Sequence, residues 1–118
     1  MKNNDEVAIF WDYGETRCYY YYTKLFHHQS SITENCPVPT NTSGYTVVEN
    51  IRSVAQTFGS IKLFKAYLEV SENVIALSRP LLLSELQSSG VSLTDCPHNG
   101  RKDVADKMII GKVHMFSV

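Results

Sequence analysis

The sequence predicts a single α/β domain with three layers, in which helices cover both faces of a parallel β-sheet. Strand-like runs alternate with helical segments along the chain, and this order is typical of parallel sheets with helical crossovers. The first run, residues 7–11, is continuously apolar, which indicates a strand that is buried on both faces. A chain of 118 residues is long enough for one domain of this kind.

Local patterns define the expected elements in order. Apolar residues at helical spacing before Gly59 and after Pro80 predict helices, because glycine ends helices and proline is tolerated in a first turn. Between these two helices, apolar and polar residues alternate in the segment 60–68, which predicts a strand. The expected strands are 7–11, 60–68 and 91–95, and the expected helices are 45–58, 81–88 and 103–110. The expected core is Val7, Ile9, Phe10, Val48, Ile51, Val54, Leu63, Ala66, Leu82, Leu86, Val91 and Leu93.

Composition excludes several classes of protein. A net charge of −1 argues against a broad basic surface that packages nucleic acid, so any nucleic-acid role is local and suits an enzyme better. No apolar run approaches the roughly 20 residues that span a bilayer, and the polar start MKNNDE is unlike a secretory signal. The three cysteines cannot all pair within one chain, which favours a reducing, cytoplasmic location.

Three acidic side chains are expected where strands of the sheet end. Asp12 follows the first strand, and Asp103 and Asp106 follow the third. Ligands of parallel sheets bind at the carboxyl ends of strands, and carboxylates gathered there repel one another unless they bind a cation or a proton. Hard oxygen ligands favour Mg²⁺ or Mn²⁺, which activates water and stabilises charge on a phosphodiester. For Asp103, a helix N-cap is the alternative role.

Two motifs become visible when residues 14–33 are set aside. Tyr13 then meets Glu34, and the chain reads VAIFWDYENCPVP, with D-x-x-N after the first strand. Further on, GVSLTDCPHNGRKDVADKMII combines a strand with K-x-x-A-D at a helix start. Both motifs in this order resemble the NYN family of PIN-like ribonucleases, and most closely its limkain-type group of meiosis regulators and mRNA stability factors. The resemblance covers residues 7–13 and 34–110.

The resemblance implies roles for individual residues. The implied catalytic residues are Asp12, Asn35 and Asp106, the implied metal ligands are Asp12, Asp103 and Asp106, and the implied RNA contacts are Arg101, Lys102 and Lys107. The cation would be Mg²⁺ or Mn²⁺. A further acidic ligand that the family places about two helical turns after the position of Asp106 is replaced here by Gly111 and Lys112.

The implied function is that of a metal-dependent endoribonuclease, a hydrolase that acts on single-stranded RNA in the post-transcriptional regulation of gene expression. Because one acidic ligand is missing, this chain is expected to be a weak or inactive enzyme. The alternative is a catalytically inactive RNA-binding or protein-interaction module of the same fold. The resemblance also implies an association with peroxisomes, and protein partners or additional RNA-binding domains in the full-length protein.

Residues 14–33 and 111–118 depart from the family pattern as an atypical insert and an atypical tail. Gly14-Glu15 can be encoded by GGTGAG and Gly111-Lys112 by GGTAAG, which contain common splice donors. Thr33-Glu34 can be encoded by ACAGAG, which contains an acceptor. One hypothesis is that both segments are translated intron sequence, so that 14–33 should be the least ordered internal segment. The alternative is a genuine family-specific loop.

Two other groups of residues carry weaker signals. The tyrosines at positions 19–22 could stack on bases, but consecutive strand positions face alternate sides, so an exposed loop is expected. Cysteines and histidines could indicate zinc, although their spacing fits no finger or ribbon. These residues are Cys18, His27, His28, Cys36, Cys96 and His98.

Overall fold

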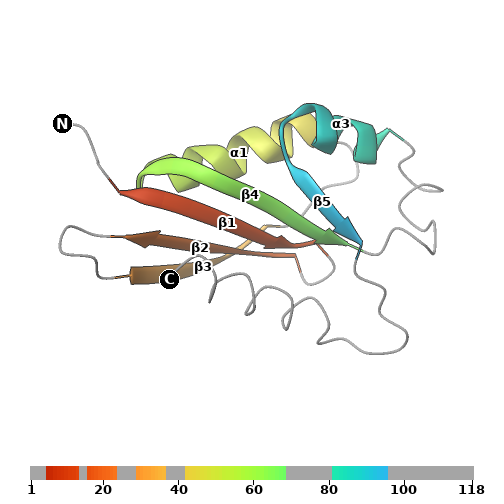
Figure 1. The fold of residues 1–118 in the computed structure, drawn as a ribbon. Helices are drawn as coiled ribbons and strands as arrows, with labels where there is room; N and C mark the ends of the chain where they lie inside the picture. Colours follow the sequence, from red (N-terminus) through yellow and green to blue (C-terminus); the bar gives the residue numbers. More distant parts are fainter. Residues whose placement is uncertain (1–4, 14–15, 24–28, 37–41, 69–80, 96–118) are drawn as a thin grey trace.

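A computed structural model of the chain describes residues 5–13, 16–23, 29–36, 42–68 and 81–95 (Figure 1). In these residues, strands form one mixed sheet, and two helices lie together on one of its faces (Figure 1). The strands are β1 (Glu6–Asp12), β2 (Arg17–Thr23), β3 (Gln29–Asn35), β4 (Ser60–Leu68) and β5 (Ser92–Asp95), and the helices are α1 (Gly44–Gln56) and α3 (Leu82–Ser88).

The five-stranded sheet has the order β3-β2-β1-β4-β5. Strands β1, β4 and β5 run parallel, which agrees with the expected α/β class. Strands β2 and β3 are antiparallel to their neighbours, so the expectation of a wholly parallel sheet is wrong. The reason lies in the connection between β1 and β2, which is too short for a parallel crossover of a dozen or more residues.

The described residues show two layers. Helices α1 and α3 cover one face of the sheet (Figure 1). The third layer of the expected fold included a helix at 103–110, which lies outside the described residues. The face that is turned away from α1 and α3 is called the second face below.

Helix α1 is capped at its start by Ser43 and ends at Gln56, two residues before the predicted end at Phe58. The Ser43 hydroxyl accepts a hydrogen bond from the Thr46 amide at 3.2 Å, a typical N-cap. The C-cap is Thr57, whose amide bonds back to the carbonyls of the last turn. Gly59, the predicted cap, instead starts the path into β4, where a Cβ would collide with the Asp5 carbonyl.

The main core lies between the sheet and the two helices. The buried face of α1 is a stripe of Val47, Val48, Ile51 and Ala55, which agrees with the helical spacing in the sequence. Of the expected core, the following are buried: Val7, Ile9, Phe10, Val48, Ile51, Ala66, Leu82, Leu86 and Val91.

Three residues of the expected core are not fully buried. Leu63 and Leu93 are half-buried, and Val54 is 37% exposed. Val54 lies off the buried stripe of α1 and lines a pocket, so its helical spacing did not distinguish a core position from a pocket wall.

The whole tyrosine run, residues 19–22, lies in β2, so the expectation that it forms an exposed loop is wrong. Cys18 and Tyr20 are 0% and 1% exposed in the main core. Tyr22 stacks on Phe58, with ring centroids 4.9 Å apart and an interplanar angle of 12°. This packing counts against the hypothesis that residues 14–33 are translated intron sequence.

Polar contacts join the two helices to each other and to the sheet. The Gly44 amide, in the first turn of α1, donates a hydrogen bond of 2.9 Å to Glu85 Oε1 of α3. Arg52 of α1 donates to the Ser89 carbonyl at 2.6 Å, and its guanidinium lies 5.4 Å from the centre of the Phe64 ring. These contacts set the position of α1 over the sheet.

Glu85→Ala is expected to lower the free energy of unfolding by about 1 kcal/mol, because it leaves a first-turn amide of α1 without its acceptor. Urea denaturation followed by circular dichroism measures the change. Glu49→Ala, at an exposed position of α1, is the matched control and should cost under about 0.5 kcal/mol. Equal losses in the two variants would contradict the role of Glu85.

Candidate functional site

Five residues from different strands lie in one line across the second face. Asn35, Arg17, Asp12, Tyr67 and Thr94 are successive Cα partners from β3 to β5, and we call them the Asp12 row. The adjacent row of β1, β2 and β4 belongs to the core beneath the helices. Because side chains alternate between faces along a strand, the Asp12 row points to the second face.

The Asp12 row lies at the carboxyl end of β1, where parallel sheets bind ligands. Asp12 is the last residue of β1 and is 1% exposed, whereas Asn35, the last residue of β3, is exposed. The Tyr13 amide donates to the Tyr67 carbonyl at 3.1 Å, which continues the pairing of β1 with β4 just beyond Asp12. A carboxylate that is buried at a strand end loses its hydration, so it requires hydrogen-bond donors or a cation close by.

The two halves of the D-x-x-N motif therefore meet on the same face, but not side by side. Strand β2 separates Asp12 from Asn35, and two strand spacings correspond to about 10 Å between their Cα atoms. Mg²⁺ binds oxygen at about 2.1 Å, so an ion held by the Asp12 carboxylate would contact the Asn35 amide through water. Oxygen donors of this kind suit Mg²⁺ or Mn²⁺, and their spacing predicts weak binding.

The other predicted site residues cannot be placed against Asp12. Asp103, Asp106, Arg101, Lys102 and Lys107 all lie outside the described residues. Strand β4 pairs with both β1 and β5, so it lies between the first and the third of the predicted strands. In the part of the chain that is described, no three His, Cys, Asp or Glu residues form a group that could hold a metal.

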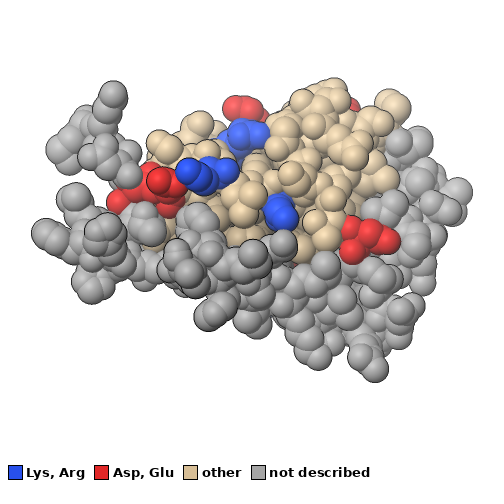
Figure 2. Space-filling model, in the orientation of Figure 1, with Lys and Arg blue, Asp and Glu red and all other residues tan. Residues whose placement is uncertain are grey.

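Basic side chains are sparse on the surface that can be described. Figure 2 shows a few Lys and Arg residues on this face, one of them beside acidic residues, and no broad basic patch among the described residues. This distribution agrees with the net charge of −1. Arg17 is the basic residue of the Asp12 row, between Asp12 and Asn35, and it is exposed.

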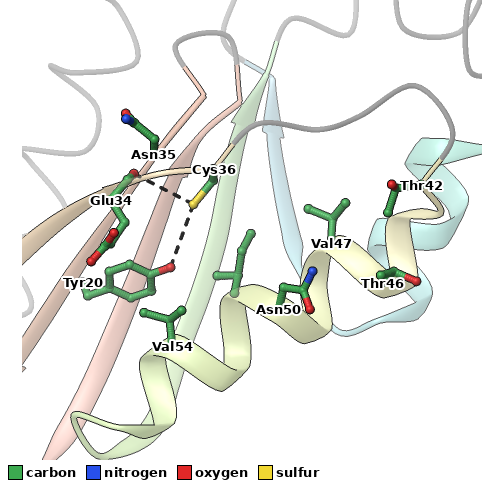
Figure 3. A pocket seen from close by; sticks show the side chains of 10 residues that line it. Tyr20, Glu34, Asn35, Cys36, Thr42, Thr46, Val47, Asn50 and Val54 are labelled. Carbon is green, nitrogen blue, oxygen red and sulfur yellow. Dashed lines mark hydrogen bonds between the residues drawn. The ribbon is translucent and has the colours of Figure 1, made fainter.

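A pocket of about 390 Å³ opens on the helix-covered face, between α1 and the ends of β2 and β3 (Figure 3). Its apolar side is formed by α1, and its polar side chains include hydroxyl, amide, carboxylate and thiol groups. The lining residues are Tyr20, Glu34, Asn35, Cys36, Thr42, Thr46, Val47, Asn50, Ile51 and Val54. Asn35 therefore belongs to both the pocket rim and the Asp12 row.

The thiol of Cys36 lies at the inner wall of this pocket, and the thiol of Cys18 is buried beside it. The Tyr20 hydroxyl is 3.9 Å from Cys36 Sγ, and the two groups point toward each other (Figure 3). The Cys18 thiol also hydrogen-bonds to Cys36, which with Tyr20 holds the pKa of Cys36 below its usual value despite burial. Burial raises the pKa values of Cys18 and Tyr20. Both cysteines are free thiols.

Sequence reasoning missed Arg17 in the Asp12 row and the Cys18–Cys36 pair. RCYYYYT carries no alternation of polar and apolar residues that could have signalled either of them. In the fold, Cys18, Tyr20 and Tyr22 face the helices, whereas Arg17, Tyr19 and Tyr21 face the other side. Of the six residues weighed as zinc ligands, Cys18 and Cys36 come together, and His27, His28, Cys96 and His98 lie outside the described residues.

No family model, no curated protein and no solved structure matches this chain. Neither helix in the described part of the chain has the length and apolar character that crossing a membrane requires.

Tyr20→Phe is expected to raise the pKa of Cys36, because the hydroxyl that stabilises the Cys36 thiolate is removed. The rate at which iodoacetamide alkylates Cys36, measured by peptide mass spectrometry across a pH series, should reach its midpoint at a higher pH. Tyr21→Phe changes the same residue type on the second face and should leave that midpoint in place. A midpoint shifted equally in both variants would contradict the assigned contact.

Proposed function

We propose that this chain is an RNA-binding domain of the NYN, PIN-like ribonuclease type, with a weak divalent-cation site at the Asp12 row. The observation that supports this most is the register of the sheet, which brings Asp12 and Asn35 to one face and one end although 22 residues lie between them in the sequence. The D-x-x-N resemblance requires these two residues to meet. The carboxyl end of a parallel strand is where ligands of such sheets bind.

The described residues suit recognition of a phosphodiester. Asp12 would hold Mg²⁺ or Mn²⁺, which, when bound, would activate water and stabilise charge on the phosphate. Asn35 would orient a water or a phosphate oxygen at the exposed end of the same row. Asp103 and Asp106 are the proposed further ligands, and Arg101, Lys102 and Lys107 the proposed RNA contacts, by resemblance to the family. The proposed biological role is metal-dependent cleavage of single-stranded RNA, inside the cell, in post-transcriptional regulation.

The geometry explains why cleavage by this chain should be slow. Strand β2 holds Asp12 and Asn35 about two strand spacings apart, so both cannot directly contact one reacting phosphate through a single ion. Catalytic groups that are misplaced by even an ångström lose much of their effect on rate. With the β2–β3 hairpin in place, Asp12 and Asn35 are therefore not held in the positions that fast cleavage of a phosphodiester requires.

The alternative function, RNA binding without cleavage, is favoured by Arg17. Its position between Asp12 and Asn35 places a fixed positive charge in the row, and an arginine can bind a phosphate in a bidentate manner without any metal. In this version of the proposal, RNA binding persists in the presence of a chelator and weakens in Arg17→Ala. Lys62→Ala, at an exposed position near the opposite end of the sheet, is its matched control.

The proposed activity predicts Mn²⁺-dependent cleavage that depends on Asp12. Labelled single-stranded RNA incubated with the chain and Mn²⁺ should be cut slowly, and EDTA should stop the reaction. Asp12→Asn should lower the rate at least about tenfold, because the neutral amide holds a cation poorly. Asp95→Asn, at the exposed end of β5 and one residue beyond the Asp12 row, should leave the rate within about twofold.

Deleting residues 14–33, which include β2 and most of β3, tests the role of the β2–β3 hairpin in the same assay. Joining Tyr13 to Glu34 restores the D-x-x-N spacing and should increase cleavage, provided that circular dichroism shows a folded chain. Slow cleavage that Asp12→Asn leaves unchanged would contradict the nuclease proposal. Chelator-resistant RNA binding that Arg17→Ala abolishes, without any cleavage, would establish the alternative.

A further inference from the structure

The Cys18–Cys36 pair has a connection to solvent through one of its members. Cys36 is 9% exposed and lines the pocket, so a small molecule that enters the pocket can reach its sulfur. Cys18 is 0% exposed and does not line the pocket. Of the two thiols, Cys36 is therefore the one that a molecule in this pocket meets.

The more accessible thiol, that of Cys36, is also expected to be the more reactive of the two. Hydrogen bonds from Cys18 and Tyr20 favour the Cys36 thiolate, which is the nucleophilic form of a cysteine. Burial disfavours the Cys18 thiolate. An accessible cysteine of lowered pKa beside a second cysteine is the arrangement found in residues that respond to oxidants.

We propose that Cys36 is a site of oxidation by small hydroperoxides and that Cys18 converts the oxidised residue into a Cys18–Cys36 disulfide. The Cys36 thiolate attacks the outer oxygen of the hydroperoxide, the O–O bond breaks, and an alcohol or water leaves with a proton. Cys36 is then a sulfenic acid. The Cys18 sulfur attacks the Cys36 sulfur, the S–O bond breaks, and the departing hydroxide takes the Cys18 proton to form water. Two thiols lose two electrons, which reduce one hydroperoxide.

The backbone around Cys36 permits this bond with a small displacement. The Cys36 amide donates to the Thr16 carbonyl at 2.6 Å, which makes Thr16 its neighbour and Cys18 its diagonal neighbour across the hairpin. Diagonal Cα atoms lie about 7–8 Å apart in an ideal ladder, whereas a disulfide spans about 4.4–6.8 Å. Cys36 follows the last residue of β3, so it can approach Cys18 without breaking the pairing of the strand.

Formation of the disulfide would therefore affect both the end of the Asp12 row and the wall of the pocket. Drawing Cys36 toward β2 changes the position of Asn35, its neighbour in sequence, at the end of the Asp12 row. The same movement withdraws the thiol from the polar wall of the pocket. This inference concerns the thiol pair alone and does not depend on RNA binding or cleavage.

The test uses the unmodified chain treated with hydrogen peroxide, then iodoacetamide, and digested with trypsin without reduction. Cleavage after Arg17, Lys24 and Arg52 places Cys18 and Cys36 in separate peptides, 18–24 and 25–52. The expected product is these two peptides joined by a disulfide, with Cys96 still alkylated. In brief exposures before oxidation, iodoacetamide should label Cys36 at least about tenfold faster than Cys18.

Two variants separate the steps of the proposal. Cys18→Ser should stop the reaction at a Cys36 sulfenic acid, which dimedone traps, and Cys96→Ser should still form the joined peptides. A disulfide that includes Cys96, oxidation that begins at Cys18, or two thiols that stay reduced while other residues oxidise would each overturn the proposal. The mapping of the unmodified chain decides the question even where Cys18→Ser fails to fold.

Discussion

The structure depends on the pairing of β1 on both of its edges. Strand β1 hydrogen-bonds to β2 on one side and to β4 on the other, and residues 7–12 are at most 1% exposed. The parallel pairing with β4 fixes the direction of the sheet and places Asp12 at the end where ligands bind. The antiparallel pairing with β2 sets the register that brings Arg17 and Asn35 into the same row. A shift of one residue in either pairing would move these side chains to opposite faces.

The sequence predicted the parallel half of the sheet well, because its signals are local. The apolar run at 7–11, the alternation in 60–68 and the buried stripe of Val47, Val48 and Ile51 each identify an element from a short window. The hairpin was missed because four tyrosines in succession show no contrast between polar and apolar positions. Only in the fold do Tyr20 and Tyr21 separate, the first into the main core and the second onto the second face beside Phe10.

The candidate site could be predicted only in part for a related reason. Asp12 does lie at the carboxyl end of a buried strand, as the apolar run before it predicts. The place of Arg17 between Asp12 and Asn35 was not predictable, since it follows from the register of the β2–β3 hairpin, which the sequence pattern did not reveal. The contact between Cys18 and Cys36 depends on the same register, and the spacing rules for metal-binding cysteines do not describe it.

The hairpin thus relates two sites on opposite faces of the sheet. On the second face, β2 places an arginine between the two residues of the D-x-x-N motif, and beneath the helices it brings Cys18 and Tyr20 against Cys36. Asn35 and Cys36 are consecutive residues, and one belongs to each arrangement. A single segment of chain therefore connects the proposed phosphate site with the proposed oxidation site.

Paramagnetic line broadening by Mn²⁺ tests the central claim, that the Asp12 row is the cation site, most directly. In ¹H–¹⁵N spectra, substoichiometric Mn²⁺ should broaden the amides of Asp12, Tyr13 and Tyr67 first, because the effect falls steeply with distance from the ion. The amides of Glu6 and Ser60, paired at the other end of the sheet, should broaden last. The selectivity should vanish in Asp12→Asn. Broadening that centres on Glu6, or that persists unchanged in Asp12→Asn, would contradict the account.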